Sequence, residues 1–100
     1  MVAVSGCGGG HGDRRESALY REGRQVFATA GCGHCHALAA AHARGGVGPD
    51  FDTSERLSRA QIRDQLDLGV AGMPSYRGRL TARQEDAVTE FLYEATHARR

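Results

Sequence analysis

The chain has 100 residues, of which 40% are apolar and 25% are charged. This length suffices for one small domain, and the composition is too apolar for a disordered chain. Thirteen basic and twelve acidic residues leave a formal charge of +1, without the basic excess that nucleic-acid binding needs. No apolar run approaches the roughly 18 residues of a membrane span. The sequence therefore argues against a large α/β enzyme, a transmembrane protein and a nucleic-acid-binding protein.

Residues 1–14 are predicted to be a flexible tether, because MVAVSGCGGGHG holds five of the fourteen glycines and shows no periodicity. Residues 15–100 are predicted to form one domain. Its first helix is expected at residues 15–30, where Tyr20, Gly23 and Phe27 recur at helical spacing. A glycine inside a helix costs roughly 1 kcal/mol relative to alanine, so we expect another helix to approach Gly23 closely.

Two further helices are marked by capping signals. Ser58 can cap with Gln61, and Leu57 can pack on Ile62, which predicts a helix over 58–68 that stops at Gly69. Thr81 and Gln84 form a second capping box. It opens a helix with one apolar face, made of Val88, Phe91, Leu92 and Ala95.

The remaining segments show no strand-like alternation. An Ala-rich stretch follows at residues 37–43, and glycine-rich loops occupy 45–50 and the region around Gly72. The predicted fold class is therefore all-α, with three main helices joined by loops that contain glycine.

The motif Cys32-Gly33-His34-Cys35-His36 carries the chemistry. Two thiols three positions apart can form thioethers with the two vinyl groups of a haem, and the following histidine can bind its iron. A thioredoxin-like redox pair would need a βαβ context, which is absent. A zinc site would need four ligands at suitable spacing, but His36 crowds Cys35 and the sequence has no second cysteine pair. The motif predicts one haem c, covalently bound through Cys32 and Cys35, with His36 as an iron ligand.

The second iron ligand has to come from the opposite face of the haem. Of the candidates, His34 lies inside the attachment turn and His42 close behind it, Met1 and His11 belong to the tether, and His97 is near the end of the last helix. Met73 remains, and it lies between Gly72, which permits a sharp turn, and Pro74, which favours extended backbone before it. We therefore predict Met73 as the second ligand.

Gly48-Pro49 follows His36 by about a dozen residues. A metal-bound imidazole almost always donates its other N–H to a fixed acceptor, and the Pro49 carbonyl suits that role. An ordinary Gly-Pro turn is the alternative at this position.

In these elements and their order, residues 16–97 resemble the class I c-type cytochromes. The matching elements are a helix with Gly23 and Phe27, the haem-attachment motif, Gly48-Pro49-Asp50, the 58–68 helix, Gly72-Met73-Pro74 and a last helix with Phe91. The resemblance implies a small monohaem cytochrome c fold, with three main helices and loops wrapped around one covalently bound haem. It also implies that the first and last helices cross at Gly23. An aromatic or basic group is expected near the haem propionates, and Tyr76, Arg77 and Arg79 are the candidates.

Val4-Ser5-Gly6-Cys7 resembles the lipobox of bacterial lipoproteins, in which the cysteine carries lipid. Only four residues precede Ser5, whereas a signal sequence needs seven or more apolar residues. Two alternatives stay open: a membrane tether through lipid on Cys7, with a start site further upstream, or a free cysteine in a truncated tail.

The resemblance implies a monomeric electron carrier that is not an enzyme. It would work outside the cytoplasm, in a bacterial periplasm or on the outer face of the cell membrane. Its partners would be redox proteins such as a quinol-oxidising complex and a terminal oxidase. The alternatives are a haem peroxidase or gas sensor with a labile Met73, and a tethered subunit of a larger membrane complex.

Overall fold

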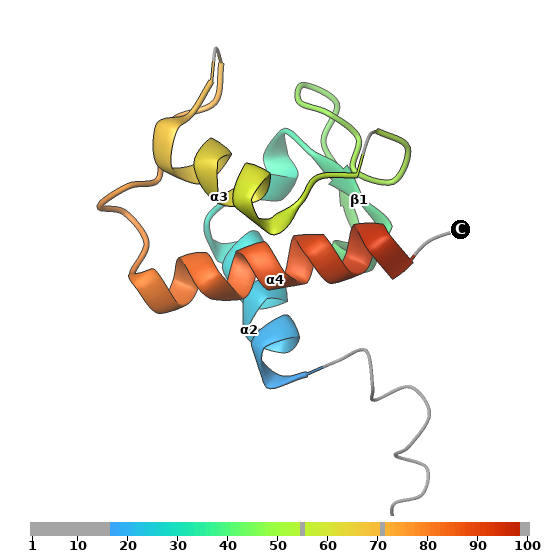
Figure 1. The fold of residues 1–100 in the computed structure, drawn as a ribbon. Helices are drawn as coiled ribbons and strands as arrows, with labels where there is room; N and C mark the ends of the chain where they lie inside the picture. Colours follow the sequence, from blue (N-terminus) through green and yellow to red (C-terminus); the bar gives the residue numbers. More distant parts are fainter. Residues whose placement is uncertain (1–16, 55, 71, 99–100) are drawn as a thin grey trace, which may run out of the picture.

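The computed structural model describes residues 17–54, 56–70 and 72–98. Three α-helices and a few short elements make up this part of the chain (Figure 1). In chain order they are α2 (Ala18–Thr29), the 3₁₀ turn η2 (Cys32–His34), β1 (Ala37–Leu38), the 3₁₀ turn η3 (Ala39–Ala41), β2 (Ala43–Arg44), α3 (Arg59–Leu68) and α4 (Ala82–Ala98).

The three predicted helices are confirmed, and their ends follow the capping signals. Ser17 Oγ accepts a hydrogen bond from Tyr20 N–H at 3.1 Å and so starts α2; the expected start at residue 15 lies outside the described residues. At α3, Ser58 and Gln61 form the reciprocal capping box, and Gly69 ends the helix. Thr81 and Gln84 make the same pair of bonds at the start of α4, at 2.8 and 3.0 Å.

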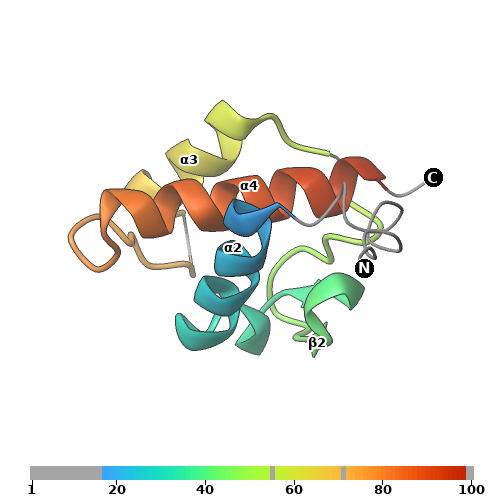
Figure 2. The ribbon, with the colours of Figure 1, turned by 90° about the horizontal axis from the view of Figure 1, so that it is seen from below.

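The contact between α2 and α4 is the most extensive helix contact among the described residues, and the two helices cross steeply (Figures 1 and 2). Gly23 lies at the crossing. A Cβ there would overlap the carbonyl oxygen of Ala87 and lie 2.5 Å from Phe91 Cβ. Around it, Phe91 makes edge-to-face contacts with Tyr20 and Phe27, with ring centroids 4.9 and 5.7 Å apart. The close approach of the α4 backbone therefore explains why a glycine stands in the interior of α2.

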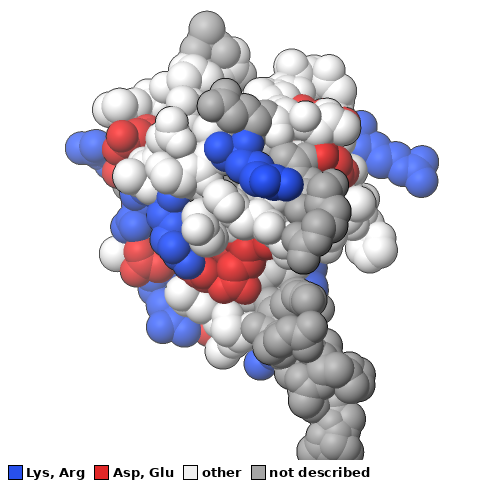
Figure 3. Space-filling view, turned by 45° about the vertical axis from the view of Figure 1, so that its right-hand side comes forward, with Lys and Arg blue, Asp and Glu red and all other residues white. Residues whose placement is uncertain are grey.

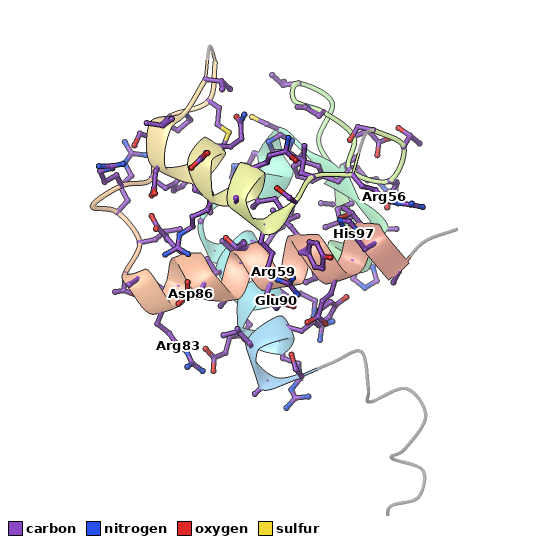
Figure 4. All side chains as sticks on the ribbon, in the orientation of Figure 1. Arg56, Arg59, Arg83, Asp86, Glu90 and His97 are labelled. Carbon is purple, nitrogen blue, oxygen red and sulfur yellow. The ribbon has the colours of Figure 1, made fainter. Side chains whose placement is uncertain are left out.

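The helix α3 packs along another side of α4 and is fastened there by ion pairs. Arg59 binds both carboxylate oxygens of Glu90, at 2.8 and 3.0 Å (Figure 4). Arg63 joins Glu85 at 3.0 Å and Asp86 at 2.7 Å. Both arginines keep contact with solvent although Glu85 is buried, and ion pairs at a protein surface contribute only about 0–1 kcal/mol each. The apolar contacts of the buried Ile62 and Leu66 are therefore the main attachment of α3.

The prediction of an all-α fold is wrong in one detail, because β1 and β2 form a two-stranded antiparallel sheet. Ala37 pairs with Arg44, and Leu38 with Ala43. The reversal between them is made by η3 and by His42, which adopts a left-handed conformation with φ 53°. Two-residue strands are too short to show alternation, and alanine favours helix, so the pattern of the sequence gave no sign of a hairpin.

No helix in the described part of the chain is both long and apolar enough to cross a bilayer. The predicted tether over residues 1–14 and the lipobox cysteine, Cys7, lie outside the described residues.

The crossing at Gly23 leads to a stability prediction. We expect Gly23→Ala to lower the free energy of unfolding by about 1–3 kcal/mol, because overpacking against Ala87 and Phe91 outweighs the better helix propensity of alanine. Urea denaturation measures the change. The matched control is Gln25→Ala on the exposed side of the same helix, which should stay within about 0.5 kcal/mol of the parent. Equal stability of the two variants would contradict the close approach.

Candidate functional site

A cavity of about 600 Å³ lies between the Cys32–His36 motif, α3, α4 and the segment after α3. This volume is within the range of small-molecule and cofactor pockets. Most of its wall is apolar, with contributions from Phe51, Leu57, Ile62, Leu66, Val70 and Leu92. Cys32, Cys35, His36, Pro49, Met73 and Tyr76 line the same cavity, so the structure brings the predicted site residues together.

The attachment motif is a tight turn directly after α2. Gly31 has φ 81°, a left-handed conformation that glycine adopts without strain, and it turns the chain out of the helix. The carbonyl of Cys32 then accepts hydrogen bonds from the N–H groups of Cys35 and His36, at 3.2 and 3.0 Å. This compact turn holds both thiols on the wall of one cavity.

Cys32 and Cys35 are free thiols in this structure. Burial raises the pKa of the Cys32 thiol to about 11. A thiol with so high a pKa stays protonated at neutral pH, whereas reactive redox cysteines have depressed pKa values. The environment of Cys32 is therefore unlike that of the nucleophilic thiol in a thioredoxin-type pair.

The His36 ring is fixed from two sides. Its Nδ1 lies 2.9 Å from the carbonyl oxygen of Pro49, the acceptor that the sequence predicted. A carbonyl only accepts, so Nδ1–H is the donor in this bond and Nε2 is the nitrogen left to face the cavity side of the site. Phe51 stacks on the ring, with centroids 4.4 Å apart and planes 19° from parallel. Gly48 leaves room for this arrangement, because a Cβ there would lie 2.5 Å from His36 Cε1.

The loop over residues 45–51 is fastened to the motif by backbone hydrogen bonds. The N–H groups of Val47 and Gly48 both donate to the Cys35 carbonyl, at 3.1 and 2.7 Å, and Phe51 N–H donates to Ala37 at 2.9 Å. A Cβ on Gly45 would overlap the Cys35–His36 peptide. These contacts place the Pro49 carbonyl against the imidazole.

Met73 reaches the cavity from a tight turn after α3. Val70 and Met73 exchange two backbone hydrogen bonds, at 2.8 and 3.2 Å, and Gly72 has φ 84° within the turn. The Met73 side chain is half-buried and lines the cavity together with Pro74.

The candidates for the propionates are placed differently from one another. Tyr76 is half-buried in the cavity wall, and its hydroxyl donates to the Ala30 carbonyl at 3.3 Å. Burial raises the pKa of this hydroxyl, so it stays protonated at neutral pH. Arg77 and Arg79 are exposed and do not line the cavity; Arg77 lies 4.0 Å from Asp67, and Arg79 lies over the Tyr76 ring.

Among the residues that the structure describes, the other candidate iron ligands do not line the cavity. His34 and His42 are exposed. His97 packs on Tyr93, and its Nε2 lies 3.0 Å from the Leu57 carbonyl (Figure 4). Met1 and His11 lie outside the described residues. Within the described ranges, no three His, Cys, Asp or Glu side chains gather as a metal ion would need.

Sequence reasoning missed Phe51 and the small residues that pack on the motif. The available signal for Phe51 was an aromatic residue directly after Pro49-Asp50, in an otherwise polar loop. The wall residues of α3 could be inferred from its apolar face, but which cavity they face depends on how α3 packs.

One face of the molecule carries mixed charge. On the face drawn in Figure 3, basic and acidic side chains lie next to one another. Two apolar side chains stand at the cavity: Val47 is 81% exposed and Val70 is 50% exposed.

Comparison with known proteins finds a family model and a solved structure that are similar to this chain. The family model described as "Cytochrome C oxidase, cbb3-type, subunit III" matches residues 18–92. Among solved structures, the c-type cytochrome SorU from Sinorhizobium meliloti is similar, with a TM-score of 0.73 and 27% sequence identity. That match covers 81% of this chain and 94% of SorU. No curated protein matches the chain significantly.

Gly48 packs on His36 whereas Gly46 does not, so alanine at these two positions should affect stability differently. We expect Gly48→Ala to displace the imidazole from the Pro49 carbonyl and to lower the free energy of unfolding by about 1–3 kcal/mol. The control is Gly46→Ala in the same loop, where a Cβ meets nothing within 4 Å. Thermal unfolding monitored by circular dichroism compares the stability of the two variants. If Gly46→Ala lowered the stability as much as Gly48→Ala, the packing argument would be refuted.

Proposed function

The chain belongs to the c-type cytochrome family described as "Cytochrome C oxidase, cbb3-type, subunit III", and on that premise we propose that it is a monohaem electron carrier with His36 and Met73 as axial ligands. Membership of this family means haem-based electron transfer. The ligand assignment, the attachment through Cys32 and Cys35, and the partners are our proposal. The observation that carries it is the His36 Nδ1–Pro49 hydrogen bond, on the wall of a cavity that Met73 also lines.

The residues present fit a haem. The cavity is large and mostly apolar, as a porphyrin requires, and two free thiols on its wall can form the thioethers. An imidazole nitrogen and a thioether sulfur, both uncharged, come from separate segments of the chain. Bound there, the haem would supply one-electron exchange between its ferrous and ferric states.

His36 is prepared for one role. Because Nδ1–H is engaged by Pro49, Nε2 is the nitrogen left to bind iron, and the acceptor also fixes the orientation of the ring. Phe51 restricts rotation of the ring. A ligand held in this way moves little when the charge on the metal changes.

Met73 supports the electron-carrier role rather than an enzymatic one. If His36 and Met73 both hold the iron, no coordination position would remain for a substrate. A thioether is a soft, neutral ligand, which raises the reduction potential relative to a second imidazole. The alternative, a peroxidase or gas sensor, would require Met73 to dissociate readily.

The exposed Val47 and Val70 suit brief docking of redox partners at the cavity mouth. The formal charge of +1 predicts weak electrostatic steering of that docking. We propose partners of the kinds expected from the sequence, a quinol-oxidising complex and a terminal oxidase, and a site of action outside the cytoplasm.

The family description favours a second form of the same function. A chain of this family can be a subunit of a larger respiratory complex rather than a free carrier. Co-purification with membrane proteins would favour the subunit, and the mass of the mature N-terminus would show whether Cys7 carries lipid.

Covalent haem is tested by extraction. In protein produced with a working cytochrome c maturation system, we expect the haem to stay with the protein in acidic organic solvent, because thioethers resist acid. Mass spectrometry should place it on the peptide that contains Cys32 and Cys35. The variant Cys35→Ala should retain at most one thioether, and the double variant Cys32→Ala/Cys35→Ala none. A colourless product with two alkylatable thiols would refute the proposal.

The axial role of Met73 is tested by Met73→Ala. We expect the near-infrared band of the ferric methionine–iron bond to disappear and the reduction potential to fall. The fall should be on the order of 0.1 V or more, within the roughly 0.8 V over which axial ligands tune haem. The control is Val70→Ala, which removes apolar surface from the same cavity but no donor atom. An unchanged spectrum and potential in Met73→Ala would show that another residue is the ligand.

A further inference from the structure

The segment between α3 and α4 carries Met73, and hydrogen bonds rather than regular structure hold it in place. Two of them join it to the end of α3. Tyr76 N–H donates to the Leu66 carbonyl at 2.7 Å, and Ser75 Oγ donates to the Asp67 carbonyl at 2.7 Å. Both bonds connect residues within ten positions of one another. They join the segment to α3 only, so α3 and this segment can still move together relative to the attachment turn.

The Tyr76 hydroxyl makes a different kind of connection. It donates to the carbonyl of Ala30, 46 positions earlier in the chain. Ala30 is the C-cap of α2 and stands two residues before Cys32. This hydrogen bond therefore spans the cavity wall, from the segment of Met73 to the turn that carries the two cysteines.

The Tyr76 side chain has two separable parts. Its half-buried ring lines the cavity and packs against the hydrophobic core, and a phenylalanine would keep these contacts. The hydroxyl adds only the bond to Ala30. At 3.3 Å this bond is longer than the usual 2.7–2.8 Å between oxygens, so its loss should change local opening more than global stability.

We propose that Tyr76 is a positioning residue that fastens the Met73 segment to the haem-attachment turn and so limits how often Met73 leaves its iron-binding position. The proposal rests on Met73 being the axial ligand. Opening the cavity on this side requires the Met73 segment to separate from the attachment turn, and the Tyr76–Ala30 bond has to break in that movement. His36 is held by contacts within a short stretch of chain, and this movement breaks none of them.

The test is Tyr76→Phe in the haem-containing protein, with imidazole as the external ligand. A net hydrogen-bond contribution at the low end of the usual range, as the 3.3 Å length implies, predicts roughly two- to fivefold faster binding of imidazole to the ferric protein, at the limiting rate set by opening. In a pH titration, the near-infrared methionine–iron band should disappear at a midpoint lower by up to about 0.7 unit, because a fivefold shift in a one-proton equilibrium equals about 0.7 pH unit.

The matched control is Tyr93→Phe on α4. This side chain also loses only a hydroxyl, but it packs against Arg59 and His97 and does not line the cavity. Tyr93→Phe should leave the imidazole rate and the titration midpoint unchanged. If the band is present and Tyr76→Phe behaves like the parent protein, the fastening role is wrong and the ligand assignment stands. If the parent ferric protein shows no methionine–iron band, the ligand assignment fails and the fastening role fails with it.

Discussion

The hydrogen bond from His36 Nδ1 to the Pro49 carbonyl is the interaction on which the site depends. It engages Nδ1 as a donor to the carbonyl, and so leaves Nε2 as the nitrogen that can bind a metal. The bond requires Pro49 to return to the motif after 13 residues. The β1–β2 hairpin, the close packing of Gly45 and the two hydrogen bonds to the Cys35 carbonyl achieve that return. The segment between His36 and Pro49 shows no periodicity in the sequence, yet it has a defined structure that places the Pro49 carbonyl against His36.

The packed helices form the rigid framework around this site. In a domain of this size the protein core is small, and its largest fully buried side chains are Phe27, Phe91, Leu38 and Val88. The crossing of α2 and α4 at Gly23 fixes the end of α2, from which the attachment turn starts. The other face of α4 receives α3, whose Ile62 and Leu66 form the opposite wall of the cavity. A cofactor that is bound covalently between these walls would add to a core that is otherwise thin.

The sequence predicted the features that depend on local chemistry. Capping residues located both later helices, and the spacing of Cys32, Cys35 and His36 located the attachment turn. The β1–β2 pair was missed because two-residue strands made of alanine, leucine and arginine leave no pattern. Phe51 on His36 and Tyr76 on Ala30 were missed for another reason: each contact joins segments that meet only in three dimensions. Residue type can indicate a candidate ligand. The contacts that hold that ligand in place depend on tertiary packing, which the sequence pattern does not show.

The two proposed iron ligands are held in unequal ways, and the inequality has a functional consequence. His36 is bound within one continuous stretch of backbone hydrogen bonds, a carbonyl acceptor and a stacked ring. Met73 stands in a short turn, and the described contacts that tie its segment to the attachment turn include one long hydrogen bond. Movement should therefore begin on the methionine side, where local opening costs least. An electron carrier works best when its ligand stays bound in both redox states. How firmly the fold restrains the Met73 segment should therefore decide whether the protein carries electrons or binds small ligands.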